Sequence, residues 1–402
     1  MNRLVLIGNG FDLAHSLKTR YEDFICWYWR NVVAYLLLKS KNVYEDTLCK
    51  VTNHKLDYYN LRDLYHSENE VLFNFINNNE DAFIINDSPF LERITKSIET
   101  KGWVDIENEY YKLLTEYSLK EEDSGKVDQL NAQLQQLQNK LVEYLSHIEI
   151  KEDLMRKDIR PKIYSPIKPQ DISIGGQKAL EDHINTGLAL DEEDWNYKLS
   201  QYGSNCYTSG RVSDYKKKVE QSKELYKGEE PPIELLLPNS IMLLNFNYTR
   251  TAHLYCKDAS IFSVNQIHGS LNNPKSVIFG YGDELDEDYK KLKNLNENDC
   301  LQHVKSIKYL EADNYRKVLE FIEAEPFQIF IMGHSCGNSD RTLLNTLFEH
   351  KNCVSIKPYY YLKDDGTDNY LELVQNISRN FTDMKLMRDR VVCKPYCEPL
   401  TK

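Results

Sequence analysis

The chain opens on a short, continuous run of apolar side chains that stops at a pair of glycines. Residues 4–7 are all apolar, and residues 8–10 read Gly-Asn-Gly. A run of this length that ends at a turn signal is typical of a strand buried on both faces of a parallel sheet. We therefore predict a strand over residues 3–7 and a helix over residues 12–29.

The same kind of apolar run returns in the last two fifths of the chain. It predicts strands over residues 241–246, 261–267, 277–279, 327–332 and 353–356, with helices in two of the gaps, 284–325 and 340–350. Strands that alternate with helices indicate a parallel sheet. The predicted fold class is α/β, with a Rossmann-like parallel sheet formed by both ends of the chain.

The stretch between these ends is polar and has a helical period. Within residues 127–148 a leucine stripe predicts a coiled coil or an antiparallel helical hairpin, and it could serve as a dimer seam or as an internal contact. Residues 158–210 are rich in loop signals, so we expect loops with short helices there. We predict a nucleotide-binding domain of residues 1–30 and 236–402. Residues 31–235 would be a large, mainly helical insertion over the carboxyl edge of the sheet.

Composition limits the kinds of partner and the cellular compartment that we expect for this chain. The chain has 402 residues and a net charge of −12, without a long basic run, which disfavours general nucleic-acid binding. Nine scattered cysteines indicate reduced thiols in a cytosol. The first apolar run is too short for a signal peptide or a membrane span. We expect a cytoplasmic protein without membrane contact, and the sequence leaves a homo-oligomer open.

Two predicted strands are followed by loops that suit a nucleotide. Gly8 and Gly10 allow close approach of the backbone to a phosphate, although the full dinucleotide fingerprint is missing. The alternative is a tight turn with Asp12 as a helix cap. Asn247 and Thr249 could present an amide and a hydroxyl to a sugar or a water, or could simply form turns.

Two further loops carry acid–base or nucleophilic groups. His268 follows a predicted strand and precedes Gly269, where an imidazole can exchange protons or be structural. Residues 333–337 match the G-x-S-x-G pattern of serine hydrolases, with Ser335 as the nucleophile. That function is disfavoured because His350 alone follows Ser335, within the first predicted helix.

Other candidate features are weaker. Cys393 and Cys397 have no second pair nearby, so no metal site is predicted. Glu107 lies on a predicted amphipathic helix. It either belongs to a solvated acidic side or faces into the pocket.

As a combination, several segments resemble the AbiH abortive-infection family of bacterial anti-phage proteins. They are residues 6–15, 245–249, 268–271, 279–284 and 333–353. The resemblance implies a phage-defence function and a phage-derived trigger. The family is distantly similar to sirtuin-like domains, which bind NAD on a Rossmann-type sheet.

That similarity implies a set of site residues. His268 corresponds to the catalytic histidine and Asn247 to the asparagine that holds the ribose and a water. The implied nucleotide-binding residues are Gly8, Asn9, Gly10, Phe11, Asp12, Thr249, Gly269, Gly333, His334, Ser335 and Asp340. Ser335 and Asp340 would bind the adenosine ribose, and Asp12 would cap the helix or stabilise a cation.

The chain departs from the sirtuin-like pattern in three places. Thr249 replaces an aspartate, Asn9 an alanine and His334 a smaller residue, and the zinc ribbon is absent, so peptide deacetylation is not expected. The resulting prediction is a phage-defence protein that binds NAD and hydrolyses it to nicotinamide and ADP-ribose. The alternatives are a nucleotide-binding sensor without catalysis and, less favoured, the serine hydrolase.

Overall fold

The computed structural model describes residues 1–39, 41–78, 83–86, 88–101, 104–120, 125–203, 231, 233–256 and 261–401. The chain forms two compact units. The sheet unit comprises Met1–Leu17, Ile150–Val277 and Tyr309–Lys402. The helical unit comprises Lys18–Glu149 and Ile278–Lys308.

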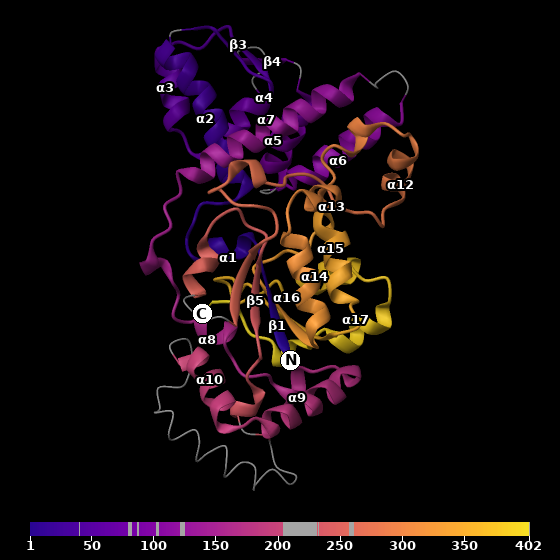
Figure 1. The fold of residues 1–402 in the computed structure, drawn as a ribbon. Helices are drawn as coiled ribbons and strands as arrows, with labels where there is room; N and C mark the ends of the chain where they lie inside the picture. Colours follow the sequence, from indigo (N-terminus) through magenta and orange to yellow (C-terminus); the bar gives the residue numbers. More distant parts are fainter. Residues whose placement is uncertain are drawn as a thin grey trace. The chain divides into compact units, whose positions relative to one another are not determined.

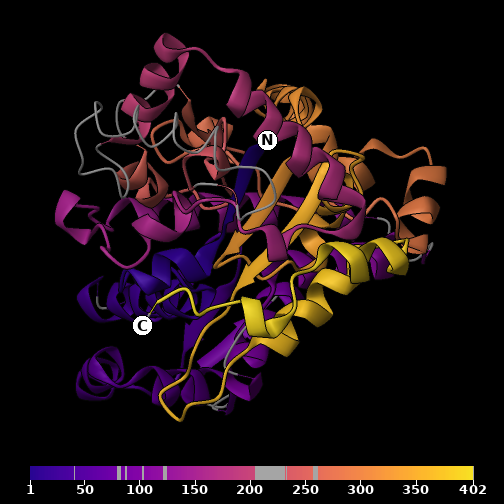
Figure 2. The ribbon, with the colours of Figure 1, turned by 90° about the horizontal axis from the view of Figure 1, so that it is seen from below.

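The sheet unit is built on five parallel strands in the order β6-β5-β1-β7-β8. Their bounds are β1 Asn2–Ile7, β5 Ile241–Asn245, β6 Phe262–Gln266, β7 Phe327–Met332 and β8 Cys353–Tyr359. In Figures 1 and 2 the indigo β1 lies beside strands from the orange and yellow end of the chain. The predicted α/β class and a parallel sheet formed by both chain ends are confirmed.

The position of β1 explains its composition. It pairs with β5 on one side and β7 on the other, and residues 4–7 are fully buried. A central parallel strand is covered on both faces, so its side chains are apolar at successive positions instead of alternating. The strand was predicted from this continuous apolar run in residues 4–7.

Two predicted elements are wrong. Residues 277–279 form no strand, although Val277 and Phe279 are buried. These residues are apolar because they are buried, but they do not pair with a neighbouring strand. The helix predicted over residues 12–29 is two helices, α1 (Asn9–Ala14) and α2 (Tyr21–Lys39). The break includes Ser16, whose φ of 61° is left-handed and cannot continue a right-handed helix.

Residues 150–203 belong to the sheet unit, whereas we expected them in the helical insertion. They form α8 (Arg160–Ile163), α9 (Gln177–Ala189) and α10 (Glu192–Gly203), so α9 and α10 are longer than the short helices predicted. Ile163 and Trp195 are buried in one cluster with Val5 of β1. The buried Arg3 guanidinium donates to the carbonyl oxygen of Ile163 at 2.9 Å. Apolar burial and this hydrogen bond therefore attach the stretch to the sheet.

The carboxyl-terminal part of the sheet unit adds four helices. They are α14 (Asn314–Ala324), α15 (Arg341–Phe348), α16 (Tyr370–Arg379) and α17 (Met384–Arg390). The helices α15, α16 and α17 all contact β8. Leu343, Leu347 and Ile377 are buried, which gives α15 and α16 an apolar face toward the sheet.

The helical unit contains the leucine stripe. The stripe lies on one helix, α7 (Lys126–Ser146), and its five leucines are all buried: Leu130, Leu134, Leu137, Leu141 and Leu145. Because α7 packs against α6 (Ile106–Ser118) and α2 of the same chain, the stripe is an internal contact and not a dimer seam.

The helical unit also contains a small antiparallel sheet that the sequence pattern did not predict. Its strands are β2 (Val43–Glu45), β3 (Lys50–Asn53) and β4 (Phe83–Asn86). The remaining helices are α3 (Tyr58–His66), α4 (Asn69–Asn78), α5 (Pro89–Lys101), α12 (Glu287–Asn294) and α13 (Lys305–Lys308). Among the described helices of both units, none has the length and apolar character needed to cross a membrane.

A buried ion pair links β8 to the segment before α9. Lys357 Nζ lies 2.7 Å from Asp171 Oδ2, and both side chains are 1% exposed. Removing one partner of such a pair leaves an uncompensated buried charge, which costs about 3–5 kcal/mol.

We predict that Asp171→Ala lowers the free energy of unfolding by about 3 kcal/mol or more. The measurement is urea unfolding followed by circular dichroism. Glu323→Ala is the control, because Glu323 is exposed where it pairs with Lys351 and His350 and its loss should barely move the midpoint. Equal effects of the two substitutions would contradict a structural role for the buried pair.

Candidate functional site

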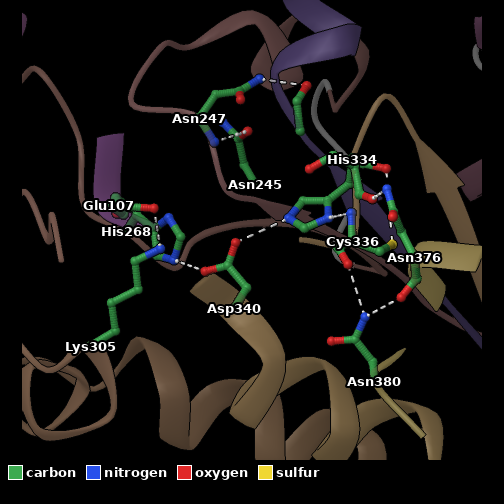
Figure 3. A network of polar contacts seen from close by, with 12 residues as sticks. Glu107, Asn245, Asn247, His268, Lys305, His334, Cys336, Asp340, Asn376 and Asn380 are labelled. Atoms are coloured by element: carbon green, nitrogen blue, oxygen red, sulfur yellow. Dashed lines mark hydrogen bonds and ion pairs between the residues drawn. The ribbon is translucent and has the colours of Figure 1, made fainter. Parts of the chain in front are cut away.

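The predicted site segments all follow strands at one edge of the sheet. β1, β5, β6 and β7 are parallel and end at Ile7, Asn245, Gln266 and Met332. Because parallel strands present their carboxyl ends at the same edge, the loops that follow lie together. The contacts below link these loops pairwise within the sheet unit (Figure 3).

The glycines after β1 and β7 pack against each other. The amide of Gly10 donates to the carbonyl oxygen of Gly333 at 2.8 Å, and that of Gly8 donates to Met332 at 3.3 Å. Gly333 has a φ of +76°, and a Cβ there would lie 2.0 Å from the backbone nitrogen of Phe11. These two amides, which we expected to face a phosphate, are thus used inside the protein.

Asp12 is not a helix cap. The N-cap of α1 is Gly8, and Asp12 lies within the helix, 1% exposed. Its Oδ2 accepts a hydrogen bond from the Thr249 hydroxyl at 2.6 Å, while Oδ1 is buried without a hydrogen-bond partner among the described residues. Burial raises the pKa of Asp12 to about 6, with the polar groups of Thr249, Thr251 and Asn247 opposing the shift.

The other residues of the first loop differ in exposure. Asn9 is exposed, whereas Phe11 is fully buried and packs its ring against His15 and Tyr255. Phe11 is therefore part of the core. The buried position of Phe11 does not support the predicted contact of this residue with a nucleotide.

The loop after β5 reaches back to the first loop. Asn247 Nδ2 donates to the carbonyl oxygen of Gly8 at 3.0 Å. The backbone amide of Asn247 donates to Asn245 Oδ1 at 3.1 Å, which is an Asx turn. The sequence analysis gave turn formation as the alternative role for this loop, and the side chain that forms the turn is that of Asn245. The side chain of Asn247 instead links the end of β5 to the end of β1.

A buried acid–base cluster lies at the ends of β6 and β7. His268 Nε2 is 3.2 Å from Asp340 Oδ1 and 3.1 Å from the Tyr309 hydroxyl. His334 Nε2 is 3.5 Å from Asp340 Oδ2. One carboxylate therefore faces two imidazoles, one with each oxygen (Figure 3).

The neighbours of His268 fix its position. The ring of Phe246 meets that of His268 edge to face, with centroids 5.3 Å apart. Gly269 has a φ of +81°, and a Cβ there would come within 2.0 Å of the Ser276 carbonyl oxygen. Gly269 thus has a backbone role that only glycine fills, since the position is both left-handed and crowded.

Tyr309 is a site residue that the sequence pattern did not reveal. It begins a short 3-10 helix (Tyr309–Glu311) in a stretch that we predicted only as helical. Its ring stacks on Tyr315 with centroids 5.4 Å apart. The residues around Tyr309 in the sequence give no indication that its hydroxyl contacts His268, because that contact depends on where β6 ends in the fold.

Ser335 does not have the surroundings of a hydrolase nucleophile. It is exposed, and the left-handed residue of its loop is Cys336. His350 packs on Phe327 at the start of β7, whereas Ser335 follows the end of that strand. Six residues of strand span roughly 20 Å, so His350 cannot complete a triad with Ser335. The structure argues against the serine-hydrolase prediction.

A comparison with protein-family models matches residues 4–361 to the family described as bacteriophage abortive infection AbiH. The chain belongs to the AbiH family. The matched range contains every predicted site residue, from Gly8 to Asp340. Membership indicates a role in bacteriophage abortive infection. A search of curated proteins gives no significant match.

Glu107 of this AbiH chain is buried within the helical unit. Its Oε1 accepts a hydrogen bond from the Gly280 amide at 3.1 Å, and Oε2 lies 2.8 Å from Lys305 Nζ. The prediction of a solvated acidic side is wrong at this position. The carboxylate and the lysine neutralise each other inside the unit.

In the described part of the AbiH chain, no group of three or more histidine, cysteine, aspartate or glutamate side chains is arranged to hold a metal ion.

We predict that Gly333→Ala destabilises the protein by at least about 3 kcal/mol, because the new methyl group would overlap the Phe11 backbone. Gly366→Ala is the matched control. Gly366 has a φ of +82° but open space around its Cβ position, so only strain of about 1 kcal/mol applies. Thermal melting of both variants tests the difference, and equal shifts would rule out the loop contact as its cause.

The raised pKa of Asp12 predicts a pH-dependent stability. The folded state binds the proton more tightly than the unfolded state, so the stability contributed by Asp12 is lost as pH rises from about 4 to about 6. Asp12→Asn should therefore stabilise the protein at pH 7.5 by up to about 3 kcal/mol, and the gain should vanish near pH 4. Melting temperatures between pH 4 and 8 measure this. A gain that grows toward low pH would contradict the assignment.

Proposed function

We propose that this AbiH protein binds NAD at the carboxyl edge of its sheet and hydrolyses it during abortive infection. Numbered by their order in the chain, the five strands of the sheet lie in the order 3-2-1-4-5. This is the strand order of Rossmann-like folds, which bind dinucleotides where the order reverses. In this chain the reversal falls between β1 and β7, whose loops contain Gly8 and Gly333.

The proposed catalytic activity rests on one observation, the contact between His268 and Asp340. His268 Nε2 lies beside two oxygens that can accept a hydrogen bond, Asp340 Oδ1 and the Tyr309 hydroxyl, so the tautomer with the proton on Nε2 is favoured and Nδ1 becomes the basic atom. The 3.2 Å contact is buried, with His268 4% exposed and Asp340 9% exposed. In a site with little water, the carboxylate also stabilises the imidazolium that forms when His268 takes a proton.

The proposed reaction breaks one bond and forms one. The bond between the ribose anomeric carbon and the nicotinamide nitrogen breaks, and its electron pair neutralises the pyridinium. Water forms the new bond to carbon, and His268 accepts its proton. Because the leaving group departs neutral, catalysis acts mainly on the positive charge that develops on the ribose. The products are nicotinamide, ADP-ribose and a proton.

Other residues would bind the substrate. Asn247, tied to Gly8 by its side-chain nitrogen, would direct its oxygen to the ribose or the water. Ser335 is exposed and would contact the adenosine ribose. Asp12 would supply negative charge near the developing cation, since Oδ1 of its buried carboxyl has no hydrogen-bond partner among the residues that the structure describes. A phage-derived trigger would control access to this site.

A second function, binding of a nucleotide without cleavage, is favoured by one observation. Thr249 stands where the sirtuin-like pattern has an aspartate, and its hydroxyl donates to Asp12 Oδ2 at 2.6 Å, so this position offers no carboxylate to the nicotinamide side of the substrate. In that case the protein would act as a sensor through a partner. NAD would raise the melting temperature, and no nicotinamide would be released.

We predict that His268→Ala lowers kcat/KM for NAD hydrolysis roughly 10²–10⁴-fold. The measurement is release of nicotinamide and ADP-ribose from NAD, separated by chromatography, with melting temperatures to exclude unfolding. Ser335→Ala should raise KM and leave kcat nearly unchanged, whereas a serine hydrolase would lose kcat. Wild-type turnover that survives His268→Ala would disprove the assigned base, and stabilisation by NAD without products would favour the sensor.

A further inference from the structure

The loop that follows β7 contains a second imidazole whose orientation is fixed. His334 Nδ1 accepts a hydrogen bond from the backbone amide of Cys336 at 3.0 Å. A neutral imidazole that accepts at Nδ1 carries its proton on Nε2. That nitrogen is the one that lies 3.5 Å from Asp340 Oδ2. The backbone therefore selects the tautomer that presents a donor to the carboxylate.

The amide that selects this tautomer belongs to a strained residue. Cys336 has a φ of 56° and is fully buried. A left-handed conformation at a residue other than glycine costs of order 1 kcal/mol and persists only where neighbours hold it. Asn380 donates to the Cys336 carbonyl oxygen at 2.9 Å, and Asn376 donates to that of Ser335 at 3.0 Å (Figure 3). Two amide side chains from the end of α16 thus hold the loop in place.

Packing restrains the same ring from another side. The centroid of the Phe246 ring lies 4.1 Å from that of His334. His334 is 6% exposed, so rotation of its ring would require movement of Phe246 or of the loop. Since Phe246 also touches His268, the two imidazoles share one aromatic wall and one carboxylate.

We propose that His334 is a positioning residue: it holds the Asp340 carboxylate toward His268 and so determines which ring nitrogen of His268 carries the proton. With His334 Nε2 beside Oδ2 at 3.5 Å, the carboxylate keeps Oδ1 directed at His268 Nε2. The catalytic consequence rests on the proposed NAD hydrolysis, whereas the effect on the tautomer does not depend on any substrate.

Two substitutions separate the contacts of His334. In His334→Asn the side-chain oxygen can still accept from the Cys336 amide, but the donor to Asp340 is lost. In His334→Gln a donor can still reach Asp340, but the acceptor for Cys336 is lost. If His334 only filled space, the two variants would behave alike apart from stability.

The first test reads the tautomer of His268 directly, by nitrogen NMR of the full chain with ¹⁵N-labelled histidine, assigned with His268→Gln. We expect the proton on Nε2 in the wild type and in His334→Gln. We expect a mixture of both tautomers in His334→Asn and in Asp340→Asn. An unchanged His268 signal in a folded His334→Asn variant would overturn the proposal.

The second test uses NAD hydrolysis. We expect His334→Asn to lower kcat about tenfold with KM within twofold of the wild type, and His334→Gln to recover most of kcat. His350→Asn, at the opposite end of β7, is the control and should behave as wild type. Absence of turnover in the wild type would overturn the proposed function alone, since the tautomer measurement still decides the role of His334.

Discussion

The close approach of two backbones at the carboxyl edge of the sheet is the constraint on which the site depends. Gly10 donates to the carbonyl of Gly333, and neither Gly8 nor Gly333 has room for a side chain. This contact fixes the end of β7 against the start of α1. Residues 334–340 can then turn toward β6, so that Asp340 meets His268. A bulkier residue at Gly333 would separate the loops and move Asp340 with them.

Sequence pattern predicted the sheet well because four of its five strands, β1, β5, β7 and β8, are buried along their whole length. Continuous apolar runs identified β1, β5, β6, β7 and β8, and their wide separation predicted a sheet made by both chain ends. The same reasoning failed for residues 277–279, since burial alone does not imply pairing. The short strands β2, β3 and β4 are missed because they are only three or four residues long. A run this short contains too few positions to show a period.

For the site, sequence identified the loops but not the contacts within them. His268 and Asp340 are 72 positions apart, and nothing local predicts that they pair. We assigned Asp340 to a ribose, whereas its carboxylate faces two imidazoles. We assigned Gly8 and Gly10 to a phosphate, whereas their amides serve loop packing. In each case the residue type was informative and the partner followed from the topology.

The buried acidic residues of this chain fall into two groups, according to the kind of side chain that each one contacts. Asp171 and Glu107 each face a lysine, so each of these buried acids has a basic side chain as its partner. Asp12 and Asp340 face hydroxyls and imidazoles instead, and neither of these groups carries a fixed positive charge. Only the second kind of environment lets a bound molecule shift a proton at modest cost. Both such acids belong to the segments that directly follow β1 and β7 at the carboxyl edge of the sheet, and this favours that edge as the place where the protein performs its chemistry.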